Sequence, residues 1–205
     1  MDGTLIDSEP VWFDTEVAIL AEFGYELGPE HWVHVLGQAN DVAVAYLLEV
    51  SGIPLTPSQL NARIEDAMAE RLSQGMDLFP GAKQLLTELD AAGVPAALVS
   101  ASSRRIVDAA LASIGPDHFR FTVSGDDVVQ GKPNPEPYLK AARLLGVDPA
   151  RCAVIEDSPN GSASGAAAGC RVLAIPHAAT IAPHPLITQM DSLASVSLDT
   201  LRGLF

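Results

Sequence analysis

Two different patterns of apolar and polar residues divide the chain. From Val94 onward, short apolar runs alternate with amphipathic stretches, which predicts strands and helices in turn. Such alternation is typical of an α/β fold with a parallel, Rossmann-like sheet covered by helices, whose ligands bind beyond the carboxyl ends of the strands. The expected strands are 94–99, 119–123, 152–155 and 171–175, and the expected helices are 104–113, 135–145 and 161–168.

Residues 10–78 have a different pattern, in which apolar positions follow helical spacing and no strand pattern stands out. A first helix is expected to end at Gly24, and two more are expected at 41–50 and 57–74, divided by Gly-Ile-Pro at 52–54. We therefore predict an all-helical insertion at 10–78, within an α/β core formed by residues 1–9 and 79–205.

Composition narrows the classes of partner. The 26 acidic and 12 basic residues give a formal net charge of −14, which repels nucleic acid and anionic membranes, so neither is expected to bind. No apolar run reaches the ~18 residues of a membrane span, and the N-terminus lacks a basic leader, so we expect a cytoplasmic protein. Cys152 and Cys170 fit neither a redox nor a zinc spacing and are expected to be small buried residues.

Four short segments carry the chemical signal, each at a strand-to-helix junction or in a nearby loop. Any one of them alone is weak, because Asp-Gly-Thr is usually a turn and Lys-Pro is usually a loop. Together, and in this order, they are highly specific. They are Met1-Asp2-Gly3-Thr4, Ala97-Leu98-Val99-Ser100-Ala101-Ser102, Gly131-Lys132-Pro133-Asn134-Pro135 and Val154-Ile155-Glu156-Asp157-Ser158-Pro159.

Two of these segments suit the binding of a phosphate. Ser100 ends an apolar run before a helix, so its hydroxyl and the backbone N–H groups that follow can hold an anion. Capping of that helix by Ser102 or Ser103 is a compatible alternative. Lys132 lies between a glycine and a proline, in a rigid loop that presents a cation.

The fourth segment suits a metal ion. Glu156 and Asp157 follow an apolar strand directly, and adjacent carboxylates repel each other unless a cation neutralises them. Oxygen ligands are those that Mg²⁺ prefers, which makes Mg²⁺ the expected cofactor. Ser158 and Pro159 fit the N-cap and the first position of the next helix.

In these motifs the chain resembles the haloacid dehalogenase superfamily, and in particular its phosphatase and phosphomutase branch with a helical cap. The likeness spans essentially the whole chain, and the run from Asp2 to Pro10 extends the first motif. In that family the first motif is Asp-x-Asp-Gly-Thr, at the end of the central strand. The resemblance implies that the first aspartate attacks phosphorus and that Asp2 is the second, the general acid and base.

This alignment puts the nucleophilic aspartate, and the central strand that carries it, before Met1. Methionine is common between the two aspartates in this family, so an internal methionine taken for a start codon is one explanation. The other is a genuinely short and catalytically dead chain. We favour the first because the other motifs are intact, and we expect the 205-residue chain to be inactive.

The resemblance also implies roles for the remaining motif residues. Asp157, the preceding aspartate and the backbone carbonyl of Asp2 would hold Mg²⁺, with Glu156 acting through water. Ser100, the N–H of Ala101 and Lys132 would stabilise charge on the transferring oxygens. Thr4 and Asp7 resemble supporting residues.

The helical insertion distinguishes the subclasses. It contains no lysine, which a phosphonate-cleaving relative needs, and Trp12 and Asn40 stand where a hexose-phosphate mutase has histidine and arginine. Both departures favour hydrolysis of a small phosphomonoester, and the run from Asp7 to Trp12 resembles that of sugar-phosphate phosphatases. Trp12 and Gln38 are the expected substrate contacts, and the cap histidines His31 and His34 are further candidates.

Two other functions stay open, a hexose-phosphate mutase and an inactive phosphosugar-binding protein. A signalling receiver domain also gathers acids, a hydroxyl and a lysine around Mg²⁺, but it has no helical insertion of about 70 residues and is nearer one compact domain in size. The sequence does not indicate an oligomeric state.

Overall fold

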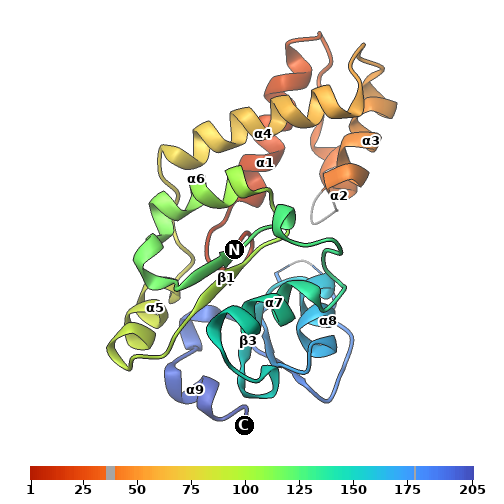
Figure 1. Ribbon diagram of the computed structural model, residues 1–205. Coiled ribbons are helices and arrows are strands. Elements are labelled where there is room, and N and C mark those ends of the chain that lie inside the picture. The colour runs from red at the N-terminus through yellow and green to blue at the C-terminus, as the bar shows by residue number, and fades with distance from the viewer. Residues whose placement is uncertain (36–39, 178) are drawn as a thin grey trace.

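The computed structural model describes residues 1–35, 40–177 and 179–205. The elements, in chain order, are α1 (Glu9–Ala21), η1 (Pro29–His31), α2 (Trp32–Val35), α3 (Asn40–Ser51), α4 (Pro57–Ser73), α5 (Ala82–Ala91), β1 (Ala97–Val99), α6 (Arg104–Ile114), η2 (Pro116–His118), β2 (Phe121–Val123), η3 (Gly125–Asp127), α7 (Glu136–Leu145), η4 (Pro149–Arg151), β3 (Ala153–Glu156), α8 (Pro159–Ala167), β4 (Arg171–Ala174), β5 (Ile187–Gln189), η5 (Leu193–Ser195) and α9 (Leu198–Arg202). Figure 1 shows a helical part at one end of the molecule and an α/β part at the other.

All strand pairs in the described residues are parallel, which confirms the expected α/β class. β1 pairs with β2, with Leu98 opposite Thr122. β4 lies between β3 and β5, with Val172 opposite both Val154 and Ile187. The sheet thus has two parts, since no ladder in these residues joins β1 to β3. Each expected strand is present, and α5, β5 and α9 were not expected.

The regular structure from residue 9 to residue 73 is helical throughout its described parts, as the pattern predicts. Helix α4 begins with a capping box, in which Thr56 accepts from the Gln59 backbone N–H and the Gln59 side chain bonds back to the Thr56 N–H. The apolar faces of α1, α3 and α4 enclose a hydrophobic cluster that includes Leu20, Leu47 and Leu60, each fully buried.

Helix α4 belongs to both parts of the molecule. Its last turns bury Met68 and Leu72 against Ile106 and Val107 of α6, within the hydrophobic cluster that continues under the sheet. Figure 1 shows α4 extending from the helical part over α6. Trp12 of α1 packs against both clusters. The domain boundary at residue 78 stays a prediction, because these helices join the two parts by continuous packing.

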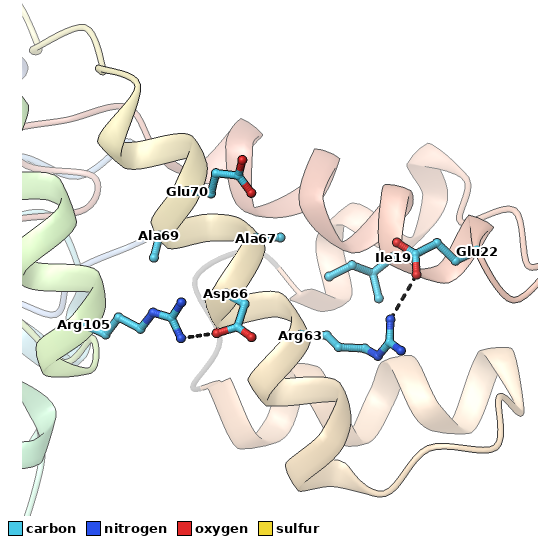
Figure 2. A pocket seen from close by; sticks show the side chains of 8 residues that line it. All are labelled: Ile19, Glu22, Arg63, Asp66, Ala67, Ala69, Glu70 and Arg105. Atoms are coloured by element: carbon cyan, nitrogen blue, oxygen red, sulfur yellow. Dashed lines mark hydrogen bonds and ion pairs between the residues drawn. The ribbon is translucent and has the colours of Figure 1, made fainter.

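Two ion pairs flank α4. Arg63 of α4 donates to Glu22, at the C-cap of α1, over 3.0 Å, and Arg105 of α6 contacts Asp66 of α4. Both pairs are exposed and therefore stabilise the fold by only a few tenths of a kcal/mol to about 1 kcal/mol each. The two ion pairs lie at a cavity of about 610 Å³, which Figure 2 shows. The cavity is lined by Ile19, Glu22, Arg63, Asp66, Ala67, Ala69, Glu70 and Arg105.

None of the helices in the described part of the chain is long and apolar enough to cross a membrane.

Glu16 is an acidic residue inside the helical part. It is only 6% exposed, and among the described residues its Oε2 has no hydrogen-bond donor. Burial raises the pKa of Glu16 to about 7, because a carboxylate without a partner is costly in an apolar interior. The neutral form of Glu16 therefore fits this fold better than the charged form.

Replacing Glu16 by Gln should make the fold less sensitive to rising pH. The unfolded chain ionises near pH 4.5, whereas the folded carboxyl ionises near pH 7, so stability falls as pH rises through this window. Urea unfolding should show Glu16→Gln near wild type at pH 4.5 and more stable by roughly 3 kcal/mol at pH 8.5. The exposed control Glu26→Gln should show no such pH-dependent gain, and an equal gain in both variants would contradict the assignment.

Candidate active site

The first motif forms a tight turn whose aspartate is held by hydroxyl groups. Ser8 Oγ donates to Asp2 Oδ1 over 2.5 Å, and Ser102 Oγ donates to Asp2 Oδ2 over 2.9 Å. Ser8 follows the turn directly, whereas Ser102 lies 100 residues away, beyond the end of β1. Both carboxylate oxygens are thereby oriented by groups that carry no charge.

Ser100 lies at the carboxyl end of β1, as the sequence predicts. Its backbone N–H continues the ladder to Val123 over 2.9 Å, and its side-chain oxygen accepts from the Ser102 N–H over 3.1 Å. Ser103 occupies the N-cap position of α6 but makes no capping bond with its side chain. Ser100 and Ser102 therefore connect β1 to Asp2 through one short chain of hydrogen bonds.

Lys132 and Glu156 form a buried ion pair. Lys132 Nζ lies 2.5 Å from Glu156 Oε1 and 3.1 Å from the carbonyl oxygen of Val99, and the two side chains are only 10% and 6% exposed. Tyr138 also donates to Glu156. Burial works against the charged form of Glu156, but Lys132 and the Met1 ammonium outweigh it and hold the pKa of Glu156 below its usual value.

Asp157 faces the Asp2–Thr4 turn. Thr4 Oγ1 donates to Asp157 Oδ1 over 2.6 Å, and a side chain at Gly3 would place Cβ only 2.2 Å from Asp157 Oδ2. Burial and the charge of Glu156 together raise the pKa of Asp157, despite the opposing effect of the Met1 ammonium. Because φ of Gly3 is +66°, glycine is required here both for the backbone conformation and for the close approach.

The structure thus brings Asp2, Ser100, Lys132, Glu156 and Asp157 to one edge of the sheet. Ala101 is exposed in the loop after Ser100. Ser158 caps the helix that follows Asp157, as expected, because its Oγ accepts from the Gly161 N–H.

The substrate contacts expected in the helical part are not assembled in the same way. Trp12 is half-buried in packing, and Gln38 lies outside the described residues. His31 bonds to Tyr46 over 2.7 Å, and His34 stacks on the same ring. Their contact with substrate stays a prediction.

The donors at this edge fit Mg²⁺ in kind, since they are carboxylate and carbonyl oxygens. The raised pKa of Asp157 indicates that its charge is not fully balanced by its surroundings. In the described part of the chain, no three His, Cys, Asp or Glu side chains gather closely enough to hold a metal ion. A bound ion would therefore also need backbone carbonyls, water or a further carboxylate. Asp2, Glu156 and Asp157 stay predicted ligands.

Four residues make contacts that the sequence did not predict, although Ser8 and Ser102 lie within segments that it singled out. Ser8, Ser102 and Tyr138 donate to the acidic side chains, and His177 Nε2 lies 2.8 Å from the carbonyl oxygen of Gly3. The sequence signal for Ser102 and His177 was the position of a polar residue shortly after a strand. This signal does not indicate which motif each residue contacts.

The cavity beside α4 is a separate feature. None of the residues that line it belongs to the four motifs. We place the candidate active site at the motif residues, because they bring acids, a cation and hydroxyl groups into contact where β1 and β3 end.

Replacing Gly3 by Ala should destabilise the fold more than the same change at Gly24. Both glycines have positive φ, +66° and +79°, so both variants carry the strain of the backbone. Only Gly3 also faces the Asp157 carboxylate, whereas nothing lies within 4 Å of a Cβ at Gly24. Urea unfolding should show an additional loss of about 1–3 kcal/mol for Gly3→Ala. Equal losses would contradict the close approach.

Replacing Lys132 by Met should destabilise the fold by about 3–5 kcal/mol, because it leaves Glu156 charged and buried without its partner. Adding Glu156→Gln to the same chain should recover part of this loss. The exposed control Lys83→Met should change stability by less than about 0.5 kcal/mol in chemical denaturation. A double variant no more stable than Lys132→Met alone would argue against the pair as the cause.

Comparisons with known proteins identify a matching family and several relatives. Residues 1–175 match the family described as haloacid dehalogenase-like hydrolase. Hexitol phosphatase B of Escherichia coli (strain K12) is 30% identical over 209 residues, which cover 100% of this chain and 91% of that protein. A bifunctional riboflavin kinase/FMN phosphatase of Arabidopsis thaliana is 33% identical over 178 residues, 86% of this chain, and the chain spans 47% of its length.

A solved structure has the same architecture. CbbY from Rhodobacter sphaeroides in complex with phosphate superimposes with a TM-score of 0.86 at 26% identity, covering 98% of this chain and 96% of that one. The motifs, the parallel sheet with its helical part and the match over most of the length agree. The chain belongs to the haloacid dehalogenase-like hydrolase family.

Proposed function

We propose that the complete enzyme is a Mg²⁺-dependent phosphatase that hydrolyses a small sugar or polyol phosphate through an aspartyl-phosphate intermediate. The observation that carries the proposal is the contact network around Asp2, in which Ser8 and Ser102 orient both oxygens of one carboxyl group. A carboxyl group oriented in this way, at the same edge of the sheet as Ser100 and Lys132, suits general acid–base catalysis.

The relatives support a phosphorylated small molecule as substrate. Hexitol phosphatase B shares the whole length of this chain, and CbbY has been solved with phosphate and, in a mutant form, with xylulose-(1,5)bisphosphate. The net charge of −14 disfavours a nucleic acid substrate. We infer that a neutral polyol or sugar carries the phosphate.

The attacking carboxylate would belong to an aspartate joined directly to Met1 in a longer form of the chain. The Met1 ammonium lies close enough to favour the charged forms of Glu156 and Asp157, although burial still leaves the pKa of Asp157 raised. A residue attached to this nitrogen would therefore lie beside the two acids at the end of β3. Its strand would pair between β1 and β3, which share no ladder in the described residues.

In the first step, an oxygen of that aspartate bonds to phosphorus while the ester P–O bond breaks, and protonated Asp2 gives its proton to the leaving alkoxide. In the second step, Asp2 takes a proton from water, whose oxygen bonds to phosphorus as the aspartyl P–O bond breaks. Inorganic phosphate and the free alcohol are the products. Ser100, the Ala101 N–H and Lys132 stabilise negative charge on the phosphate oxygens during both steps.

Asp157 and the main-chain carbonyl of Asp2 would hold Mg²⁺, with Glu156 acting through water. When bound, the ion supplies positive charge that offsets the charge on the transferring phosphate. Hydrolysis fits better than mutase chemistry. Trp12 is packed between two hydrophobic clusters, and the Asn40 side chain donates to Asn61, so neither is a free proton relay or a phosphate-binding cation.

A form of the protein extended by the residues encoded in frame before Met1 should hydrolyse hexitol phosphates when Mg²⁺ is present. Asp2→Asn in that form should lower kcat by about 10²–10⁴, because it removes the acid and base. The measurement is phosphate release under saturating substrate, with chelator as a second arm in which activity should be lost.

Asp14→Asn is the matched control, since Asp14 is an exposed carboxylate on α1 and should keep activity within about twofold. Full activity of Asp2→Asn, or equal turnover by the 205-residue and extended forms, would overturn the proposed mechanism. Phosphosugar binding by the extended form without turnover would instead support the inactive binding protein.

A further inference from the structure

His177 reaches the catalytic turn from a segment that belongs to none of the four motifs. It follows β4 by three residues, and its Nε2 lies 2.8 Å from the carbonyl oxygen of Gly3. A carbonyl oxygen can only accept, so Nε2 carries the proton and donates it to this bond. The nitrogen that meets the turn is therefore engaged as a donor and is not free to transfer protons.

The ring of His177 packs against an aromatic side chain that is itself held in place. It stacks on Phe79 with ring centroids 4.7 Å apart and an interplanar angle of 13°. The backbone N–H of Phe79 in turn donates to the carbonyl oxygen of Leu5 over 2.9 Å, and Leu78 bridges to Ile6. The residue that holds Gly3 is thus itself oriented by the chain just beyond the same turn.

The bond from His177 completes the anchoring of one peptide group. The N–H of Thr4 donates to the carbonyl oxygen of Met1 over 3.2 Å, while the carbonyl of Gly3, in the same peptide group, accepts from His177. Because a peptide group is planar, holding both its ends fixes its orientation. That orientation in turn directs Thr4, whose hydroxyl donates to Asp157 over 2.6 Å.

We propose that His177 is a positioning residue of the phosphatase, which fixes the Gly3–Thr4 peptide so that Asp2 and Asp157 keep their relative placement. The inference rests on the proposed function for its catalytic meaning. His177 acts through Gly3 and not on the substrate, so its loss should affect the rate of the chemical steps more than the binding of substrate. An amide side chain, which also carries N–H donors, should partly replace it.

The contact itself can be tested in the 205-residue chain without any activity. In NMR spectra, His177→Ala should shift the Gly3 carbonyl carbon and the Thr4 amide and speed exchange of the amides in the turn, whereas His177→Gln should shift them less. His184→Ala is the control, because His184 is an exposed histidine of the same segment whose ring accepts from the nearby Leu186 N–H and not from the turn. Unchanged turn resonances in His177→Ala would overturn the contact.

The consequence for the reaction can be tested in the extended form. His177→Ala should lower kcat between about 10- and 100-fold, with KM within twofold, as expected for a misplaced catalytic group. His177→Gln should recover kcat to within about threefold of wild type. Unchanged kcat in His177→Ala, a rise confined to KM, or equal losses in His177→Ala and His177→Gln would each overturn the positioning role.

The two proposals fail in different ways. An unsubstituted extended form that releases no phosphate from hexitol phosphates would overturn the proposed function, and with it the catalytic meaning of His177. The NMR comparison would then still decide whether His177 holds the Gly3 carbonyl. An active extended form with a fully active His177→Ala variant would overturn only the role of His177.

Discussion

The buried contact between Lys132 and Glu156 is the interaction on which the rest of the candidate site depends. Lys132 touches the Val99 carbonyl at the end of β1 and Glu156 at the end of β3, so one ammonium group bridges the two parts of the sheet. No ladder in the described residues makes this connection. Either charge without its partner would be costly in a region so little exposed to water. The 131–135 loop, which carries Lys132, is therefore held against the ends of both strands.

The other acids of the site are held by hydroxyl groups. Ser8 and Ser102 donate to Asp2, and Thr4 donates to Asp157, while Lys132 pairs with Glu156. Hydroxyl donors orient a carboxylate without cancelling its charge. In a chain with a net charge of −14, this leaves the edge of the sheet attractive to a cation.

The helical part meets the site through shared packing. Trp12, four residues after Ser8, contacts the hydrophobic clusters of both parts, and α4 buries Met68 and Leu72 beside α6. On the proposed function, the motif residues would bind the phosphate group that substrates of this class share. Selection among such substrates would then depend on the helical part, where polar side chains such as His34 are exposed.

The alternating α/β order, the helical character of residues 9–73 and the four motifs could all be predicted from the sequence. Apolar periodicity reports the local backbone and its buried face, so β1, β3, α6 and α8 were expected near their observed bounds. The short β5 and α9 had too few residues for a periodic signal, and α5 was missed although its ten residues include buried Leu85 and Leu86.

The contacts between the motifs could not be predicted in this way, because they depend on the folded chain. The sequence grouped Lys132 with the phosphate-binding residues and Glu156 with the metal ligands, whereas packing pairs the two with each other. Packing also brings Ser102 to Asp2 across 100 residues and His177 to Gly3 across 174 residues. Such contacts depend on how strands and loops converge in space, and spacing along the chain carries no information about that distance.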